Sequence, residues 1–95
     1  DLCLTGEGAL DAQSAFGKTV VGVSRLARSM GCPTLALAGT IGEGAEAVHR
    51  EGVAAYFSIC PGPITFDEAV KNAASLIEKA AEQVVRAFVA GQSSE

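Results

Sequence analysis

The chain has 95 residues, of which 48% are hydrophobic and 19% charged, and its formal net charge at pH 7 is -4. This length allows one small domain, and this hydrophobic content argues against a disordered chain. A negatively charged chain without a Lys/Arg cluster argues against nucleic acid as a partner, and no apolar run reaches the roughly 20 residues that span a membrane. Cys3, Cys32 and Cys60 follow neither a disulfide framework nor metal-ligand spacing, which favours free thiols in a cytoplasmic protein.

The first part of the chain alternates between strand and helix patterns. Leu2–Thr5 is a short apolar run that predicts a strand, and Gly17–Met30 has helical periodicity. Gly31 and Pro33 end that helix, and Thr34–Ala38 predicts a second strand. The residues expected on the buried face of the helix are Val20, Val23, Ala27 and Met30.

The next segment contains a glycine-rich loop and a third strand. Gly39–Gly44 has the composition of a loop, and Ala45–Glu51 is expected to form a short helix. Val53–Ile59 is apolar on both faces, which is typical of a central parallel strand. Residues 61–63, Pro-Gly-Pro, predict a rigid turn.

The longest predicted helix begins at Thr65 and ends near Gly91. Thr65 and Glu68 have the spacing of a capping box. The apolar stripe that we expect to be buried consists of Phe66, Val70, Ala73, Ile77, Ala80, Val84 and Phe88. Asp67, Lys71, Glu78, Glu82 and Arg86 are expected on the solvated face. Residues 92–95 form a polar tail.

A strand followed by a helix, repeated three times, predicts an α/β fold with a parallel sheet and right-handed connections. Three strands leave two open sheet edges, and an exposed apolar edge is prone to aggregation. We therefore expect these strands to be a fragment of a larger sheet, completed by a missing part of the protein or by a second copy.

Polar, glycine-rich loops follow all three predicted strands, at Gly6–Phe16, Gly39–Gly44 and Pro61–Ile64. In a parallel sheet these loops lie at one edge, where such folds bind their ligands. Glycine lets backbone N–H groups approach a ligand, and helix N-termini favour anions, so this edge is a candidate phosphate or carboxylate site. The sequence contains neither a P-loop motif nor G-x-G-x-x-G.

The first of these loops carries most of the candidate functional residues. Glu7 and Asp11 are each interpreted as a magnesium ligand or as a base that takes a proton from a substrate hydroxyl. The alternative is turn chemistry, with Asp11 capping local N–H groups. Gln13 and Ser14 can hydrogen-bond a ligand, or Ser14 can cap the following turn. Lys18 lies in the first turn of a helix, where the helix dipole disfavours a cation unless an anion is bound; the alternative is a solvated lysine.

Several blocks of the sequence resemble one family. The run D-L-x-L-T-G-E-G-x-L-D-x-Q-S-x-x-G-K, then G-V-x-R-L-A, P-T-L-A-L-A-G and F-S-I-x-P-G-P-I-T-x-x-E-A, closely resembles the C-terminal portion of the type I glycerate kinases. The resemblance covers essentially the whole chain. Ala9 departs from the pattern, since the family usually has arginine at this position.

The resemblance implies a phosphotransferase that uses ATP and Mg²⁺ to phosphorylate D-glycerate. It also implies that residues 1–91 are the C-terminal part of a three-layer, Rossmann-like α/β domain, with the N-terminal part of the enzyme missing. Asp11 and Lys18 are then the candidate catalytic residues, and Glu7 the candidate metal ligand. The candidate substrate- or nucleotide-binding residues are Gly6, Glu7, Gly8, Gln13, Gly17, Gly39 and Thr40.

Two other function classes remain open at this point. The isolated chain is expected to be inactive, so it is alternatively a non-catalytic α/β remnant or a self-associating interaction module. A nucleotide-binding module of a redox enzyme is the third reading, and the missing G-x-G-x-x-G motif argues against it.

Overall fold

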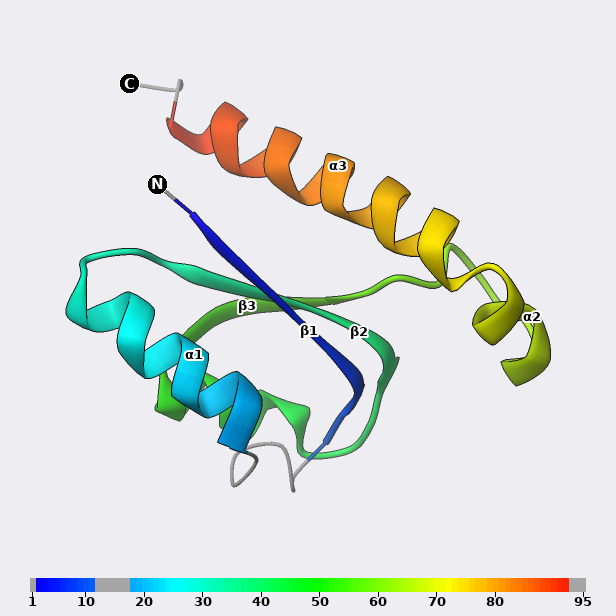
Figure 1. Ribbon diagram of the computed structural model, residues 1–95, viewed down its shortest axis with the longest axis horizontal. Helices are drawn as coiled ribbons and strands as arrows, with labels where there is room; N and C mark the ends of the chain where they lie inside the picture. Colours follow the sequence, from blue (N-terminus) through cyan, green and yellow to red (C-terminus); the bar gives the residue numbers. More distant parts are fainter. Residues whose placement is uncertain (1, 12–17, 93–95) are drawn as a thin grey trace. The chain divides into compact units, whose positions relative to one another are not determined.

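The computed structural model describes residues 2–11 and 18–92 (Figure 1). The elements in chain order are β1 (Cys3–Leu10), α1 (Lys18–Ser29), β2 (Thr34–Ile41), the 3-10 helix η2 (Ala45–Glu51), β3 (Val53–Ser58), α2 (Phe66–Lys71) and α3 (Ala73–Gln92). The chain divides into two compact units, Asp1–Ser58 and Ile59–Glu95. The first unit contains the sheet, and the second contains α2 and α3.

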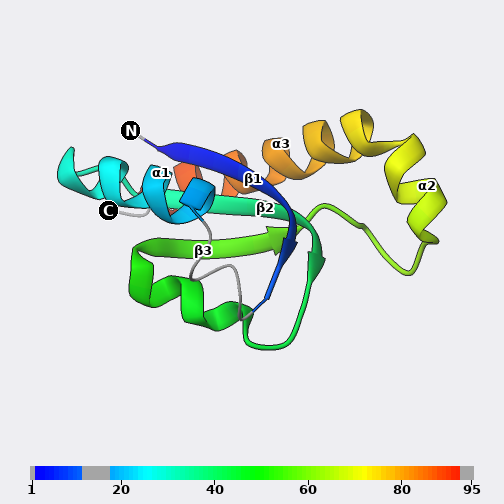
Figure 2. The same ribbon diagram turned by 60° about the horizontal axis from the view of Figure 1, so that its bottom comes forward.

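The three strands form one parallel sheet in the order β1-β2-β3, which confirms the predicted α/β class (Figure 2). Thr5 lies opposite Ala36, and Ala36 lies opposite Tyr56. β3 was expected to be a central strand, but β2 takes that place in the described sheet. The apolar composition of β3 therefore does not reflect a central position among these three strands.

The core of the first unit lies where α1 and η2 pack against the sheet. The buried cluster consists of Leu10, Val20, Ala36, Ala38, Ala45, Val48 and Val53. Ala36 and Ala38 are small residues at the centre of β2, and Val20 and Val48 come from α1 and η2. Burial of these side chains supplies the main apolar stabilisation of the sheet.

Two strands extend beyond their predicted ends. β1 continues from Thr5 to Leu10, and β2 continues from Ala38 to Ile41, with Ala9 still opposite Thr40. The prediction that residues 6–10 and 39–41 lie in loops is therefore wrong. Glycine, glutamate and alanine are depleted in strands and give residues 6–10 a weak strand signal, as Gly39 does at the end of β2; the ladder between the two strands overrides it.

Helix α1 forms almost as predicted, but its buried face differs. Val20, Val21, Ser24 and Ala27 are buried, whereas Met30 is 76% exposed. The prediction that Met30 packs in the core is wrong because the helix ends one residue earlier.

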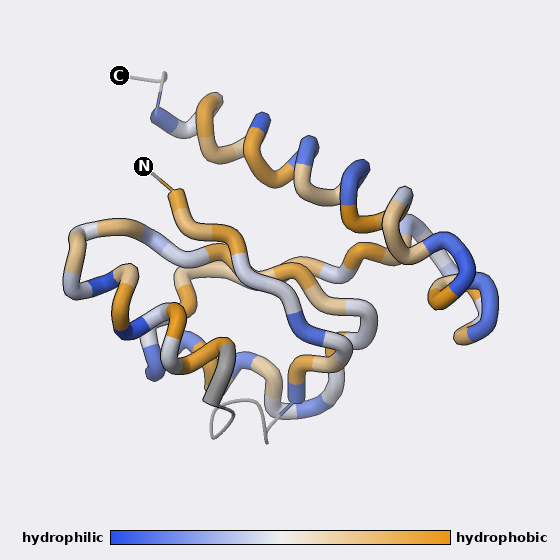
Figure 3. Tube along the Cα trace, viewed as in Figure 1, coloured by the Kyte–Doolittle hydropathy of each residue, from blue (hydrophilic) through white to orange (hydrophobic). Residues whose placement is uncertain are grey.

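The predicted long helix is two helices separated at Asn72, whose backbone N–H and side-chain Nδ2 both donate to the Glu68 carbonyl, each at 3.0 Å. Thr65 caps α2 as expected, with its Oγ1 accepting from the Glu68 N–H at 3.1 Å. Figure 3 shows apolar and polar residues alternating along α3. Val84 is buried, but Phe66, Val70 and Ile77 are exposed, so burial of the whole stripe is not found.

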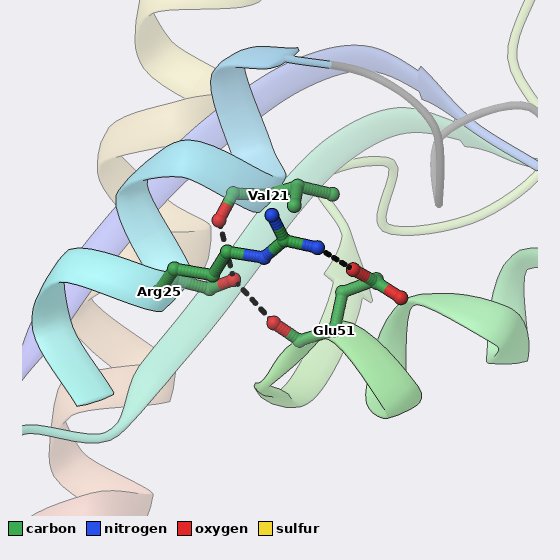
Figure 4. A network of polar contacts seen from close by, with 4 residues as sticks. Val21, Arg25 and Glu51 are labelled. Carbon is green, nitrogen blue, oxygen red and sulfur yellow. Dashed lines mark hydrogen bonds and ion pairs between the residues drawn. The ribbon is translucent and has the colours of Figure 1, made fainter. Parts of the chain in front are cut away.

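A polar contact network joins α1 to the end of η2 (Figure 4). The Ser24 hydroxyl is fully buried and lies 2.9 Å from the Glu51 carbonyl oxygen and 3.1 Å from that of Val21. Arg25 forms an ion pair with the Glu51 carboxylate at 2.7 Å, and the Arg25 side chain is 69% exposed. The buried hydroxyl is therefore the stronger of the two links, since solvent screens the ion pair.

We predict that Ser24→Ala destabilises the first unit by about 1–2 kcal/mol, because the Glu51 carbonyl loses its buried donor. Arg25→Gln, the matched control, removes only an exposed ion pair and should cost less than about 1 kcal/mol. Urea unfolding followed by circular dichroism gives both values. A cost for Ser24→Ala no larger than that for Arg25→Gln would contradict this assignment.

Candidate functional site

The carboxyl ends of β1 and β2 lie side by side and bring two glycine-rich segments together (Figures 1 and 2). Glu7 lies opposite Ala38, and Ala9 lies opposite Thr40. Because both strands run in the same direction, the residues that follow them emerge at one edge of the sheet. This edge has the position at which open α/β sheets bind ligands.

Glu7 is an exposed residue of β1, not a loop residue as expected from the sequence. Its Oε1 accepts a hydrogen bond from the Gly8 N–H at 3.3 Å. Along the sheet, Ala38 lies opposite both Glu7 and Ser58, so these three residues form one row across the strands. The carboxylate thus lies at an open position near the carboxyl end of an edge strand.

Asp11 is the first residue after β1 and is half-buried. The chain next to it is held by the loop that follows β2, where the Gly42 N–H donates to the Leu10 carbonyl at 2.5 Å. This hydrogen bond is the last one of the parallel ladder, next to the Leu10–Ile41 pair. The backbone beside Asp11 is therefore positioned by the end of β1 and by the loop after β2, which are distant in the sequence.

The glycines at this edge have different surroundings. A Cβ built on Gly39 would lie 3.0 Å from the Gly8 carbonyl oxygen, so this position requires a glycine for close approach of the two strands. A Cβ on Gly8 would meet nothing within 4 Å, and one on Gly6 would make only an ordinary contact with the Leu37 oxygen at 3.8 Å. Gly39 is thus a packing requirement, whereas Gly8 faces open space.

The structure brings together most of the predicted site residues in the ends of β1 and β2: Gly6, Glu7, Gly8, Asp11, Gly39 and Thr40. Gln13 and Gly17 lie outside the described residues. Lys18 is the first residue of α1, and its side chain is also outside the described part. The loop after β3 belongs to the second unit.

Gly42 is a residue of this edge that sequence reasoning did not single out. In the sequence, Gly42 is marked only by its place in a glycine-rich loop. The contacts that favour glycine there involve Leu10 and Asp11, which are distant in the sequence. His49 is exposed; its Nδ1 lies 2.8 Å from the Val53 carbonyl oxygen, and its ring stacks on Tyr56. These contacts link η2 to β3.

No helix in residues 2–11 and 18–92 is long and apolar enough to span a membrane. Within the same part of the chain, no group of three or more His, Cys, Asp or Glu side chains is placed to hold a metal ion.

Comparison with known proteins gives the family. The model of the "Glycerate kinase family" matches residues 1–89. The chain is 43% identical over 84 residues to a glycerate kinase of Halalkalibacterium halodurans and 39% identical to one of Bacillus subtilis, covering 88% of this chain and 22% of each relative. It is 33% identical over 90 residues to glycerate 2-kinase of Escherichia coli, covering 95% of this chain and 24% of that protein. The chain, which spans less than a quarter of the length of these relatives, therefore belongs to the glycerate kinase family.

Proposed function

We propose that this chain forms the substrate-contacting sheet edge of a glycerate kinase, which transfers the γ-phosphoryl group of ATP to a hydroxyl of D-glycerate. The observation that carries this proposal is the placement of Glu7 near, and of Asp11 just beyond, the carboxyl end of β1, beside the end of β2. Phosphoryl transfer depends mainly on holding two substrates in line and neutralising charge. A rigid sheet edge with carboxylates and accessible backbone suits that task.

The glycine-rich ends of the two strands are proposed to contact the phosphates or the glycerate carboxylate. The open space at Gly8 lets a ligand approach the β1 backbone closely. Thr40 is exposed at the matching level of β2, where its hydroxyl can donate to an oxygen of the ligand. Gly6, Gln13 and Gly17 are carried over from the family motif as further binding residues.

Asp11 is proposed to orient or deprotonate the glycerate hydroxyl that attacks the γ-phosphorus. It directly follows a strand whose backbone is fixed by pairing with β2, so its carboxylate is attached to a rigid element. Lys18, at the N-terminus of α1, is proposed to neutralise a phosphate or the glycerate carboxylate. An anion at this helix end would also interact favourably with the helix dipole.

Glu7 is the proposed magnesium ligand, directly or through water. Mg²⁺ bound with ATP typically takes one or two protein carboxylates and fills its other positions with phosphate oxygens and water. The exposed Glu7 carboxylate fits that limited requirement. When bound, the ion would neutralise phosphate charge during transfer.

A self-associating, non-catalytic module is the second candidate function. β1 and β3 each pair with only one strand in the described sheet, so each has a free edge. The β1 sequence, Cys3–Leu10, contains neither lysine nor proline, the residues that commonly protect such an edge. Light scattering after gel filtration distinguishes a self-associating module from a kinase sheet edge. A self-associating module is expected to form stable dimers of this chain without added substrate.

We predict that the 95-residue chain alone has no measurable glycerate kinase activity, because in-line transfer needs both substrates held at once and the chain spans 22% of its relatives. A coupled ADP-release assay with D-glycerate, ATP and Mg²⁺ measures this. Turnover above that of an Asp11→Asn control chain would refute the prediction.

The catalytic roles are testable in a chimera in which this chain replaces the matching 84-residue stretch of the H. halodurans kinase. We predict that Asp11→Asn lowers kcat by about 100-fold or more, within the range for loss of a general base. Lys18→Ala removes a charge-assisted contact worth about 1.5–3 kcal/mol and should raise KM, lower kcat, or both.

The fold of the chimera should survive both substitutions, since Asp11 lies outside the buried core cluster and Lys18 is not on the face of the helix that the sequence pattern predicts to be apolar. Circular dichroism and the thermal midpoint are the controls for folding. Near-normal kinetics in both variants would assign this edge a structural role and place catalysis elsewhere in the enzyme.

A further inference from the structure

The loop after β2 contacts the end of β1 at a point where a Cβ would be crowded. A Cβ built on Gly42 would lie 3.1 Å from the Asp11 Cβ and 3.4 Å from the Leu10 carbonyl oxygen. The first separation is tighter than nine in ten real Cβ contacts. Any residue other than glycine at position 42 must therefore displace Asp11 or the loop.

The backbone conformation gives no other reason for a glycine at this position. The described glycines with positive φ are Gly31, Gly44 and Gly52, and Gly42 is not among them. Its conformation is thus one that L-residues adopt, and the contact with β1 is what selects glycine. Gly39 differs, because its missing Cβ makes room for the Gly8 backbone oxygen, within the paired strands.

We infer that Gly42 is a positioning residue for Asp11. By lacking a side chain, it lets the loop after β2 close on the end of β1, while its N–H holds the Leu10 carbonyl. Together these two contacts set where the Asp11 backbone leaves the sheet and hence where its carboxylate lies. This inference rests on the proposed function, in which the Asp11 carboxylate meets the attacking hydroxyl of glycerate.

A methyl group at position 42 should move Asp11 by a few tenths of an ångström, enough to restore ordinary contact distance. Since a misplacement of about 1 Å can cost about 100-fold in rate, we expect Gly42→Ala to lower kcat by about 10-fold. KM for glycerate should change less than kcat, because the contact acts on Asp11 and not on the substrate.

The kinetic test is a double-mutant cycle in the chimera, with Gly42→Ala, Asp11→Asn and both together. Gly42→Ala should lower kcat when Asp11 is present and have no further effect in the Asp11→Asn background, because its effect passes through the carboxylate. Gly22→Ala is the control: Gly22 is an exposed residue of α1 with open space at its Cβ, and kcat should not change. An equal loss in both backgrounds, or no loss in either, would overturn the inference.

A crystal structure of the Gly42→Ala chain tests the positioning independently of activity. The expected result is an Asp11 Cβ that has moved away from residue 42, with the Leu10–Gly42 hydrogen bond lengthened. An unmoved Asp11, with the shift confined to residues 42–44, would overturn the inference. If Asp11→Asn leaves kcat unchanged while Asp11 moves in this structure, the proposed function fails and the positioning stands.

Discussion

The parallel pairing of β1 with β2 along its whole length is the interaction on which the rest of this structure depends. The register is constant from Cys3 opposite Thr34 to Leu10 opposite Ile41. It requires the two backbones to approach closely where Gly39 meets the Gly8 carbonyl oxygen. Because the pairing continues to Leu10, Asp11 begins at a fixed point of the sheet and not within a long loop.

The same constraint explains why α1 and η2 matter to the site. α1 packs on β1 and β2, η2 packs on β3 and on α1, and the Ser24 hydroxyl joins α1 to the last residue of η2. η2 directly follows the loop that contains Gly42, so the position of that loop depends on η2 packing. The candidate site is thus held by the core of the first unit, although its functional groups lie at the sheet edge.

The alternation of strands and helices could be predicted from the sequence because the apolar runs and their glycine or proline boundaries are local features. Thr34–Ala38 and Val53–Ser58 are recognisable in this way, and so is the Thr65 cap. The ends of β1 and β2 could not be predicted, since their glycines form strand only through tertiary pairing. Met30 was misassigned because periodicity does not show where a helix ends.

The candidate site was predictable in location but not in its packing. Glu7 and Asp11 were found because polar residues at the exit of a parallel strand are typical of ligand sites. Gly42 was not, because the reason for a glycine there is a contact with Asp11, which no local pattern reveals.

The central claim, that the ends of β1 and β2 contact the substrates, is tested most directly by hydrogen–deuterium exchange of the chimera with and without D-glycerate, Mg²⁺ and a non-hydrolysable ATP analogue. We expect slower amide exchange in peptides that cover residues 5–11 and 38–44, and unchanged exchange at the end of α1 and in residues 30–33. Slower exchange elsewhere in the enzyme, with neither strand end affected, would contradict it.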